Sequence, residues 1–344
     1  MAAPSAAQSV APERGHPLEA LLRRAVTVPT VLVLFALGLA SAPLWVPAAL
    51  LVDLAFRGRR AAFRCGAFLL WYLACETGGL VLILATNALR LRGHEAFIDA
   101  NTRLQHLFAK ALFRGAQLTF GIRLEVEGAD ALGRGPVLLL VRHATVVDTL
   151  IPALAVEPRY GLRLRYVLKS ELLWDPCLDI VGNRMGHYFA RRGSPDSERE
   201  VARVASLGQG LGPSEGVLIY PEGTRFTDEK RDRILARLEE RGETERLLQA
   251  QRLRHVLPPR VEGTLGLLDA APTADVAICA HTGLESTTSF WDLWTGAARG
   301  GVLRGTCWRI PRAEIPSTRQ ARTVWLADQW QRVDDWIDAN RRSS

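Results

Sequence analysis

Two long apolar runs near the start of the chain set the first limit on its fold. No charged residue occurs from Ala25 to Val52, and the run from Cys65 to Leu89 carries a single charge, Glu76. A helix needs about 20 apolar residues to cross the hydrocarbon core of a bilayer, and each run is long enough. We therefore expect this part of the chain to be embedded in a membrane.

The charges around the two runs leave their topology open. Arginines lie both between the runs and on their outer flanks, so the positive-inside rule favours neither orientation of a two-span hairpin. A hairpin that enters and leaves on one side keeps every arginine on that face, and Pro29, Pro43 and Pro47 provide a bend. A charge such as Glu76 costs about 2.5–3.5 kcal/mol at the bilayer centre, which also disfavours a deep span. We favour a hairpin embedded from the cytosolic side, with two full spans as the alternative.

From residue 97 the pattern changes to short apolar runs that alternate with helix-like stretches, which is typical of an α/β domain. We expect a mixed central sheet flanked by helices, preceded by the membrane hairpin. The predicted parts are a polar tail over 1–24, the hydrophobic hairpin over 25–92 and the α/β domain over 97–344. The predicted strands are Gly121–Val126, Val137–Val141, Leu164–Leu168, Tyr188–Ala190, Val217–Tyr220, Val276–Ala280 and Thr306–Ile310. The predicted helices are Phe97–Phe113, Thr149–Val156, Ser197–Leu207, Asp228–Gln251 and Ala321–Ala339.

Charge and cysteine content indicate the surroundings of the chain. The net charge of +7 and the pI near 9.5 suit anionic partners, such as a membrane surface, phosphate or nucleic acid. The five cysteines are scattered and contain no C-x-x-C pair. We interpret them as reduced thiols in a protein that faces the cytosol.

A histidine and an aspartate follow one of the predicted strands. His143 comes just after Val137–Val141, and Asp148 lies five residues further on. The carboxyl end of a buried strand is where α/β sheets build their sites. A carboxylate bonded to one ring nitrogen would orient the imidazole and leave the other nitrogen to take a proton. His94 and Asp99 repeat the spacing, but no strand precedes them, so we interpret His94 as a solvated residue.

Two further segments carry residues that suit an anion. The block Glu222–Arg225 follows the strand Val217–Tyr220 and combines an acid, a glycine, a hydroxyl and an arginine. Glycine lets backbone N–H groups approach a ligand, and arginine presents a planar fork to phosphate oxygens. The alternative is a turn closed by a local Glu222–Arg225 pair. The segment Gly186–Gly193 contains Arg191 and Arg192 at a strand end, which alone would be a solvated surface pair.

Gly212–Gly216 matches the G-x-S-x-G pattern of a hydrolase nucleophile elbow. That elbow requires a strand before the serine and a helix after it, whereas here a helix precedes Ser214 and a strand follows. A serine hydrolase that uses Ser214 is therefore the disfavoured alternative.

Taken together and in this order, His143–Asp148, Gly186–Arg192 and Glu222–Arg225 resemble the 1-acylglycerol-phosphate (lysophospholipid) acyltransferase family. The sequence from Lys169 to Pro176 also looks like that family, and Leu257–Gly263 looks like its eukaryotic-type branch. The resemblance covers residues 100–310. Arg142 is a departure, because many members have asparagine before the histidine.

The resemblance implies direct transfer of a fatty acyl group from acyl-CoA or acyl-carrier protein to the hydroxyl of a lysophospholipid. The acceptor is expected to be 1-acylglycerol-3-phosphate, which gives phosphatidate, or alternatively another lysophospholipid or glycerol-phosphate acceptor. The expected partners are membrane lipids and the acyl carrier, without nucleic acid, metal or cofactor. The catalytic domain is expected on the cytoplasmic face, at a bacterial inner membrane. A catalytically silent lipid-binding membrane protein is a further alternative.

The resemblance also assigns roles to residues. His143 is expected to take the proton of the acceptor hydroxyl, with Asp148 as its orienting acid. The residues expected to bind the acceptor phosphate all follow predicted strands; they are Arg192, Glu222, Gly223, Thr224 and Arg225. Within that group Glu222 organises the pocket, and Gly223 and Thr224 shape it. Weaker candidates are Arg191, Lys169 and Arg260.

Overall fold

The computed structural model describes residues 17–57, 61–145, 154, 162–191, 197–287 and 290–341. Its strands form one seven-stranded sheet in the order β1-β7-β6-β2-β5-β3-β4. The strands are β1 Arg123–Glu127, β2 Val137–Val141, β3 Arg163–Lys169, β4 Tyr188–Ala190, β5 Glu215–Ile219, β6 Asp275–Thr282 and β7 Val302–Ile310. The α-helices are α1 Pro17–Ala40, α2 Ala42–Ala55, α3 Ala62–Asn87, α4 His94–Phe120, α6 Pro176–Arg184, α7 Ser197–Ser206, α8 Asp228–Glu240, α9 Thr244–Arg252, α10 Val261–Ala270, α11 Phe290–Trp294 and α12 Arg319–Arg341. Short 3-10 turns are η1 Ala88–Arg92, η2 Ala129–Leu132, η5 Ser170–Trp174 and η6 Arg312–Glu314.

The sheet is mixed, as the sequence predicts. Strands β6, β2, β5, β3 and β4 run parallel to one another, while β7 is antiparallel to β6 and parallel to β1. The five parallel strands therefore place their carboxyl ends on one edge of the sheet. The expected α/β class, a mixed sheet flanked by helices, is confirmed.

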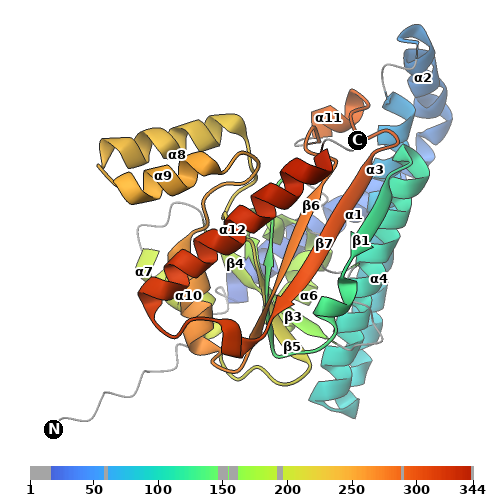
Figure 1. Cartoon of the computed structure of the whole chain (residues 1–344). Helices are drawn as coiled ribbons and strands as arrows, with labels where there is room; N and C mark the ends of the chain where they lie inside the picture. Colours follow the sequence, from blue (N-terminus) through green and yellow to red (C-terminus); the bar gives the residue numbers. More distant parts are fainter. Residues whose placement is uncertain are drawn as a thin grey trace.

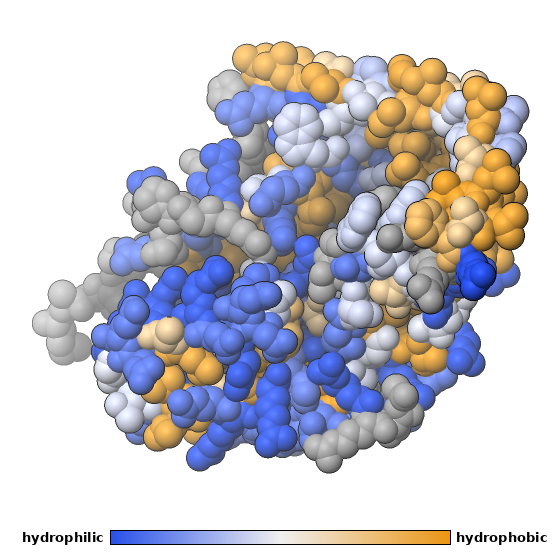
Figure 2. Space-filling view, turned by 90° about the horizontal axis from the view of Figure 1, so that it is seen from above, coloured by the Kyte–Doolittle hydropathy of each residue, from blue (hydrophilic) through white to orange (hydrophobic). Residues whose placement is uncertain are grey.

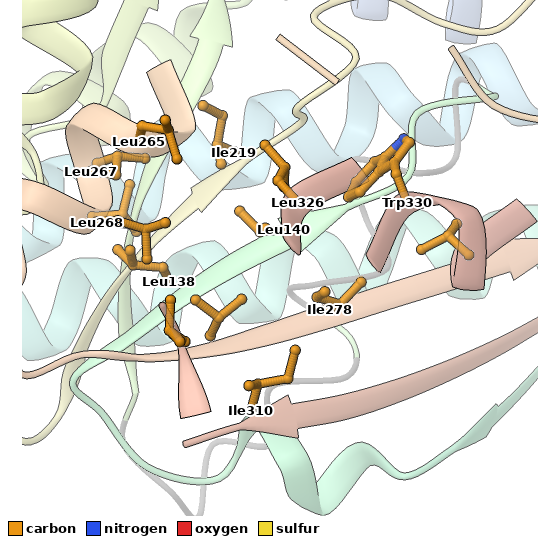
Figure 3. Close-up of a cluster of buried hydrophobic side chains, with 14 of the residues drawn as sticks. Leu138, Leu140, Ile219, Leu265, Leu267, Leu268, Ile278, Ile310, Leu326 and Trp330 are labelled. Atoms are coloured by element: carbon orange, nitrogen blue, oxygen red, sulfur yellow. The ribbon is translucent and has the colours of Figure 1, made fainter. Parts of the chain in front are cut away.

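The continuous apolar run Val137–Val141 forms the centre of the sheet because both of its faces are covered. Leu138 and Leu140 belong to the core on one face, and Val137, Leu139 and Val141 belong to the core on the other. Figure 3 shows the first of these cores, in which Leu140 and Ile278 of the sheet lie near Leu326 and Trp330 of α12. In Figure 1 α12 crosses this face, while α3 and α4 lie side by side behind the sheet.

Apolar residues of α12 recur at helical spacing, which predicts an apolar stripe on one face of the helix. Leu326, Trp330, Val333 and Ile337 are all fully buried. Asp334 on the same helix is also buried, and its Oδ1 accepts the backbone N–H groups of residues 254 and 255 at 2.9 and 2.6 Å. The helix thus holds both the sheet and the segment that leads to α10.

Two helix predictions differ from the structure or fall outside it. The predicted helix Asp228–Gln251 is wrong as one element, because α8 ends at Glu240 and α9 begins at Thr244. Gly242 between them adopts a φ of +65°, a left-handed conformation that ends helices. The predicted helix Thr149–Val156 lies outside the described residues except for Leu154.

The N-terminal helices present their apolar side chains outward. By length and composition, Pro17–Ala40 and Ala62–Arg92 could each cross a membrane, and the shorter Ala42–Ala55 lies between them. Leu44 and Leu54 of α2 are 77% and 74% exposed. Figure 2 shows hydrophobic residues gathered on the side of the molecule where Figure 1 places α1, α2 and α3. This surface supports association with a membrane.

The same helices are tied to the α/β domain by buried polar contacts. In α1, Arg23 and Arg24 pair with Asp179 of α6 at 2.8 and 2.7 Å, and the Asp179 side chain is fully buried. In α3, Glu76 is also fully buried and accepts the backbone N–H of Cys177 at 3.3 Å. Glu76 therefore faces the α/β domain. Whether the hairpin is re-entrant or spans the membrane stays a prediction.

The expectation of five reduced thiols is wrong for one pair. Cys279 of β6 and Cys307 of β7 form a disulfide, with their Cα atoms 4.4 Å apart. They lie far apart in sequence, but the antiparallel register places them directly opposite each other. Cys65, Cys75 and Cys177 are free cysteines.

Candidate active site

The residues predicted from sequence gather at the carboxyl edge of the parallel strands. His143 follows β2, Glu222–Arg225 follows the adjacent strand β5, and Lys169 ends β3. Ligand sites of α/β sheets lie at this edge, because the loops that leave the strands there converge. The prediction that His143 and the Glu222–Arg225 block each follow a strand is therefore confirmed.

Hydrogen bonds of its N–H and carbonyl groups fix the backbone of His143. Its N–H donates to Glu222 Oε1 at 2.9 Å, and its carbonyl oxygen accepts the N–H of Phe226 at 2.9 Å. Both partners belong to the segment after β5, so the histidine and the Glu222–Arg225 block are one structural unit. The His143 ring lies against the ring of Tyr220, with 4.7 Å between the ring centroids.

The side chain of Glu222 links this unit to a third segment of the chain. Its side chain is buried, and its second oxygen, Oε2, accepts the backbone N–H of Leu257 at 2.9 Å. The carboxylate thus joins the end of β2 to the segment before α10. A buried carboxylate that accepts two N–H groups keeps these backbone donors satisfied.

Gly223, in the turn after β5, is in close contact with the side chain of Arg260. Gly223 has a φ of +66°, a backbone conformation that is strained for residues other than glycine. Its N–H donates to Tyr220 O at 2.9 Å. The Arg260 side chain lies against Gly223, so closely that its Nε would be 2.7 Å from a Cβ added there. The weaker candidate Arg260 is therefore at the site.

Lys230 of α8, which is not among the residues predicted from sequence, also contacts this turn. Its ammonium donates to Thr224 Oγ1 at 3.0 Å and to Arg225 O at 2.9 Å. The signal is local: Thr227 caps α8 by accepting the Lys230 N–H, which places Lys230 in the first turn. Side chains in a helix lean toward its N-terminus, so this lysine reaches back to the preceding turn. Lys230, Arg225 and Arg260 bring three cations to this turn, which also contains the carboxylate of Glu222.

The second predicted segment lies farther from His143. His187 is buried against Tyr166, with 4.8 Å between ring centroids, and its burial lowers its pKa to about 3. It is therefore a neutral packing residue. Arg191 is exposed just after the edge strand β4, three positions from β2 in the sheet. Neighbouring strands lie about 4.8 Å apart, so Lys169 on β3 is the nearer of these two weaker candidates.

Two predicted residues, Asp148 and Arg192, lie outside the described residues. Their assigned roles, orienting acid and phosphate ligand, stay predictions. In the part of the chain that is described, no group of three or more His, Cys, Asp or Glu side chains is arranged to hold a metal ion.

Comparison with known proteins bears on the family. The model of the Acyltransferase family matches residues 123–279, which include β1 to β5, the turn at Glu222–Arg225 and the first part of β6. A crystal structure of the 1-acyl-sn-glycerophosphate (LPA) acyltransferase PlsC from Thermotoga maritima is 12% identical, with a TM-score of 0.46. It covers 77% of this chain and 99% of its own. Because that identity and TM-score are low, the assignment rests on the family model and on the order of the motifs. Residues 123–279 match the Acyltransferase family, and the chain is an acyltransferase.

Proposed function

We propose that the chain transfers a fatty acyl group from an acyl thioester to 1-acylglycerol-3-phosphate, which gives phosphatidate. The observation that carries the proposal is the pair of hydrogen bonds that hold His143 against Glu222 and Phe226, at 2.9 Å each. They hold the backbone of His143 against the turn that contains Arg225. A base next to an anion site suits an acceptor that carries both a hydroxyl and a phosphate.

The proposed reaction is a direct transfer. His143 takes the proton of the acceptor hydroxyl while the hydroxyl oxygen attacks the thioester carbonyl. The new C–O bond forms, the C–S bond breaks, and the thiol leaves with the proton that His143 held. Asp148 would orient the imidazole, as the family resemblance implies. The donor is acyl-CoA or acyl-carrier protein.

The turn after β5 would hold the acceptor phosphate. Arg225 offers the fork that suits phosphate oxygens, and Thr224 with Gly223 shapes the space around it. Arg192 is proposed as a second phosphate ligand, as the family resemblance implies. A fixed phosphate keeps the hydroxyl in place against the base, which lowers the barrier to reaction.

The apolar helices would bring this site to its lipid substrates. Exposed leucines on α1 and α2 suit insertion among acyl chains. We propose that the catalytic domain lies on the cytoplasmic face of a bacterial inner membrane, where the acyl carriers are found.

The hydrolase alternative does not fit the sheet. Ser214 precedes β5, whereas the Glu222–Arg225 block follows it, and β5 has five residues. A strand of that length spans about 17 Å, so Ser214 lies at the opposite edge from His143.

The test is thiol release by the full chain in lipid vesicles, with acyl-CoA and with acyl-carrier protein as donors. The acceptors are 1-acylglycerol-3-phosphate, lysophosphatidylcholine, lysophosphatidylethanolamine and glycerol 3-phosphate. The phosphate monoester of 1-acylglycerol-3-phosphate carries more negative charge than the phosphodiesters of the other two lysolipids, and its acyl chain, which glycerol 3-phosphate lacks, keeps it in the vesicle. We therefore expect the highest kcat/KM with 1-acylglycerol-3-phosphate. Preference for another acceptor would reassign the substrate. Absence of acceptor-dependent release with every acceptor would favour a silent lipid-binding protein.

Arg225→Lys tests phosphate recognition separately. Lysine keeps the charge but loses the fork, so we expect the acceptor KM to rise about tenfold, with kcat lowered and the donor KM unchanged. If Arg225 serves only to hold the turn, the substitution would instead lower Tm and affect both substrates alike.

A further inference from the structure

Arg142, the residue before His143, is a fully buried cation. Its Nη1 donates to His281 O at 2.6 Å and to Glu285 Oε1 at 2.8 Å, and its Nη2 donates to His255 O at 2.8 Å. A buried charge is costly unless it is paired and hydrogen-bonded. The guanidinium meets both conditions, and it occupies a position that the reaction described above does not use.

Glu285 is built to serve as the counter-ion. Its carboxylate also accepts Thr282 Oγ1–H at 2.7 Å and the Gly283 N–H at 2.9 Å. Burial alone would raise the pKa of Glu285, but the Arg142 guanidinium and these hydrogen bonds lower it to about 2. The carboxylate therefore stays ionised at neutral pH.

The Arg142 guanidinium joins three segments at the catalytic edge. They are the end of β2, the end of β6 with the turn after it, and the segment before α10 that contains His255. Glu222 also binds this last segment, because its carboxylate accepts the N–H of Leu257. Two adjacent residues, Arg142 and His143, are thus tied to the same segment, one through a cation and the other through a carboxylate.

The backbone of Arg142 is fixed as well. Its N–H donates to Cys279 O at 3.1 Å, and its carbonyl oxygen lies 3.0 Å from His281 Nε2. The N–H and carbonyl of His143 are hydrogen-bonded too, so the peptide groups before, between and after these two residues are all fixed by hydrogen bonds. The position of the imidazole then depends on its side-chain torsions alone.

We propose that Arg142 is a positioning residue for His143, acting through the end of β2 with Glu285 as its partner. The inference rests on the proposed function, in which His143 is the base. A guanidinium bonds His281 O and His255 O from two different nitrogens, whereas lysine or glutamine offers a single terminal group. Loss of the fork lets the strand end shift. A displacement of about 1 Å in a reacting group can lower the rate about 100-fold.

The variants are Arg142→Lys, Glu285→Gln and the double variant Arg142→Gln/Glu285→Gln, compared in the full chain by steady-state thiol release. The matched control is Arg163→Gln, which removes an ion pair with Glu95 and Asp99 at the amino end of β3. We expect Arg142→Lys to lower kcat about 100-fold, with both KM values within about twofold of wild type. The control keeps wild-type kcat.

The double variant keeps the test valid if Arg142→Lys does not fold, because it removes both buried charges together. Its kcat should also fall about 100-fold, and by less than the product of the single effects, because the two residues act as a pair. Unchanged kcat in the folded variants, or a loss that follows the unfolded fraction in a melting curve, would overturn the proposal. His143→Ala, measured alongside, separates the two claims. If His143→Ala keeps its activity, the proposed function is wrong, because His143 is then not the base. If His143→Ala is inactive while the Arg142 variants keep their activity, only the positioning role is rejected.

Discussion

The backbone N–H of His143 donates to Glu222 Oε1 at 2.9 Å, while Glu222 Oε2 accepts the N–H of Leu257 at the same distance. One carboxylate therefore joins three segments: the end of β2, the turn after β5 and the approach to α10. These contacts fix the backbone of His143 relative to the turn after β5.

Glu222→Gln should disturb this junction. The amide has one acceptor oxygen, so its NH₂ group must face the N–H of either His143 or Leu257. We expect the free energy of unfolding to fall by about 1–3 kcal/mol, because a buried donor loses its partner, and kcat to fall with it. Urea denaturation and thiol release measure the two effects. Glu262→Gln, which changes an exposed side chain on α10, should alter neither. Wild-type stability and kcat in Glu222→Gln would contradict the role given to this carboxylate.

Gly223→Ala should affect activity more than Gly242→Ala does. Both glycines have nearly the same left-handed φ, +66° and +65°, so the backbone strain of about 1–2 kcal/mol is common to both. Only Gly223 has the Arg260 side chain against it, whereas nothing lies within 4 Å of a Cβ at Gly242. We expect similar losses of stability, but a higher acceptor KM in Gly223→Ala alone. Equal kinetics for the two variants would show that Arg260 is free to move without effect on the site.

Lys230→Met should weaken acceptor binding. The lysine ammonium bonds Thr224 Oγ1 and Arg225 O, so its loss removes a charge and loosens the turn. We expect the acceptor KM to rise about tenfold, equivalent to about 1.4 kcal/mol, with a smaller rise in Lys230→Arg. Kinetics with each substrate varied in turn distinguish this from a general effect. Lys110→Met, at an exposed position of α4, is the control and should be silent. A donor KM that rises equally in Lys230→Met would argue against a role in acceptor binding.

Asp179→Asn should loosen α1 from the α/β domain. The substitution leaves Arg23 and Arg24 without their anionic partner, although their side chains are 17% and 32% exposed and keep some hydration. We expect a loss of about 1.5–3 kcal/mol in the free energy of unfolding, and faster trypsin cleavage after Arg24. Asp335→Asn, on the exposed side of α12, should leave both unchanged. A cleavage rate equal to wild type in Asp179→Asn would mean that other contacts hold the helix.

The strands and the edge that carries the site could be predicted from the sequence, because both depend on local pattern. The run Val137–Val141 is apolar throughout because both of its faces are covered, and its end marks the edge where His143 lies. The apolar face of α12 could also be predicted, because its apolar residues recur at helical spacing. Gly242, by contrast, was a local signal for the helix break that the prediction overlooked.

Other features depend on residues far apart in sequence. The Cys279–Cys307 bond requires the antiparallel register of β6 and β7, which no spacing rule provides. Arg24 and Asp179 are 155 positions apart. The partners of Arg142 were equally hidden, so an unusual residue before the histidine could be noticed but not explained.

The most direct test of the account is the rate of thiol release by His143→Ala in lipid vesicles, with 1-acylglycerol-3-phosphate and acyl-CoA. His94→Ala, at an exposed position where α4 begins, is the matched control. The account predicts that His143→Ala lowers kcat at least about 1000-fold, from lost proton transfer worth roughly 10²–10⁴ and lost positioning, with an unchanged melting curve. His94→Ala keeps wild-type turnover. A folded His143→Ala with near wild-type kcat would contradict the central claim that this histidine is the base.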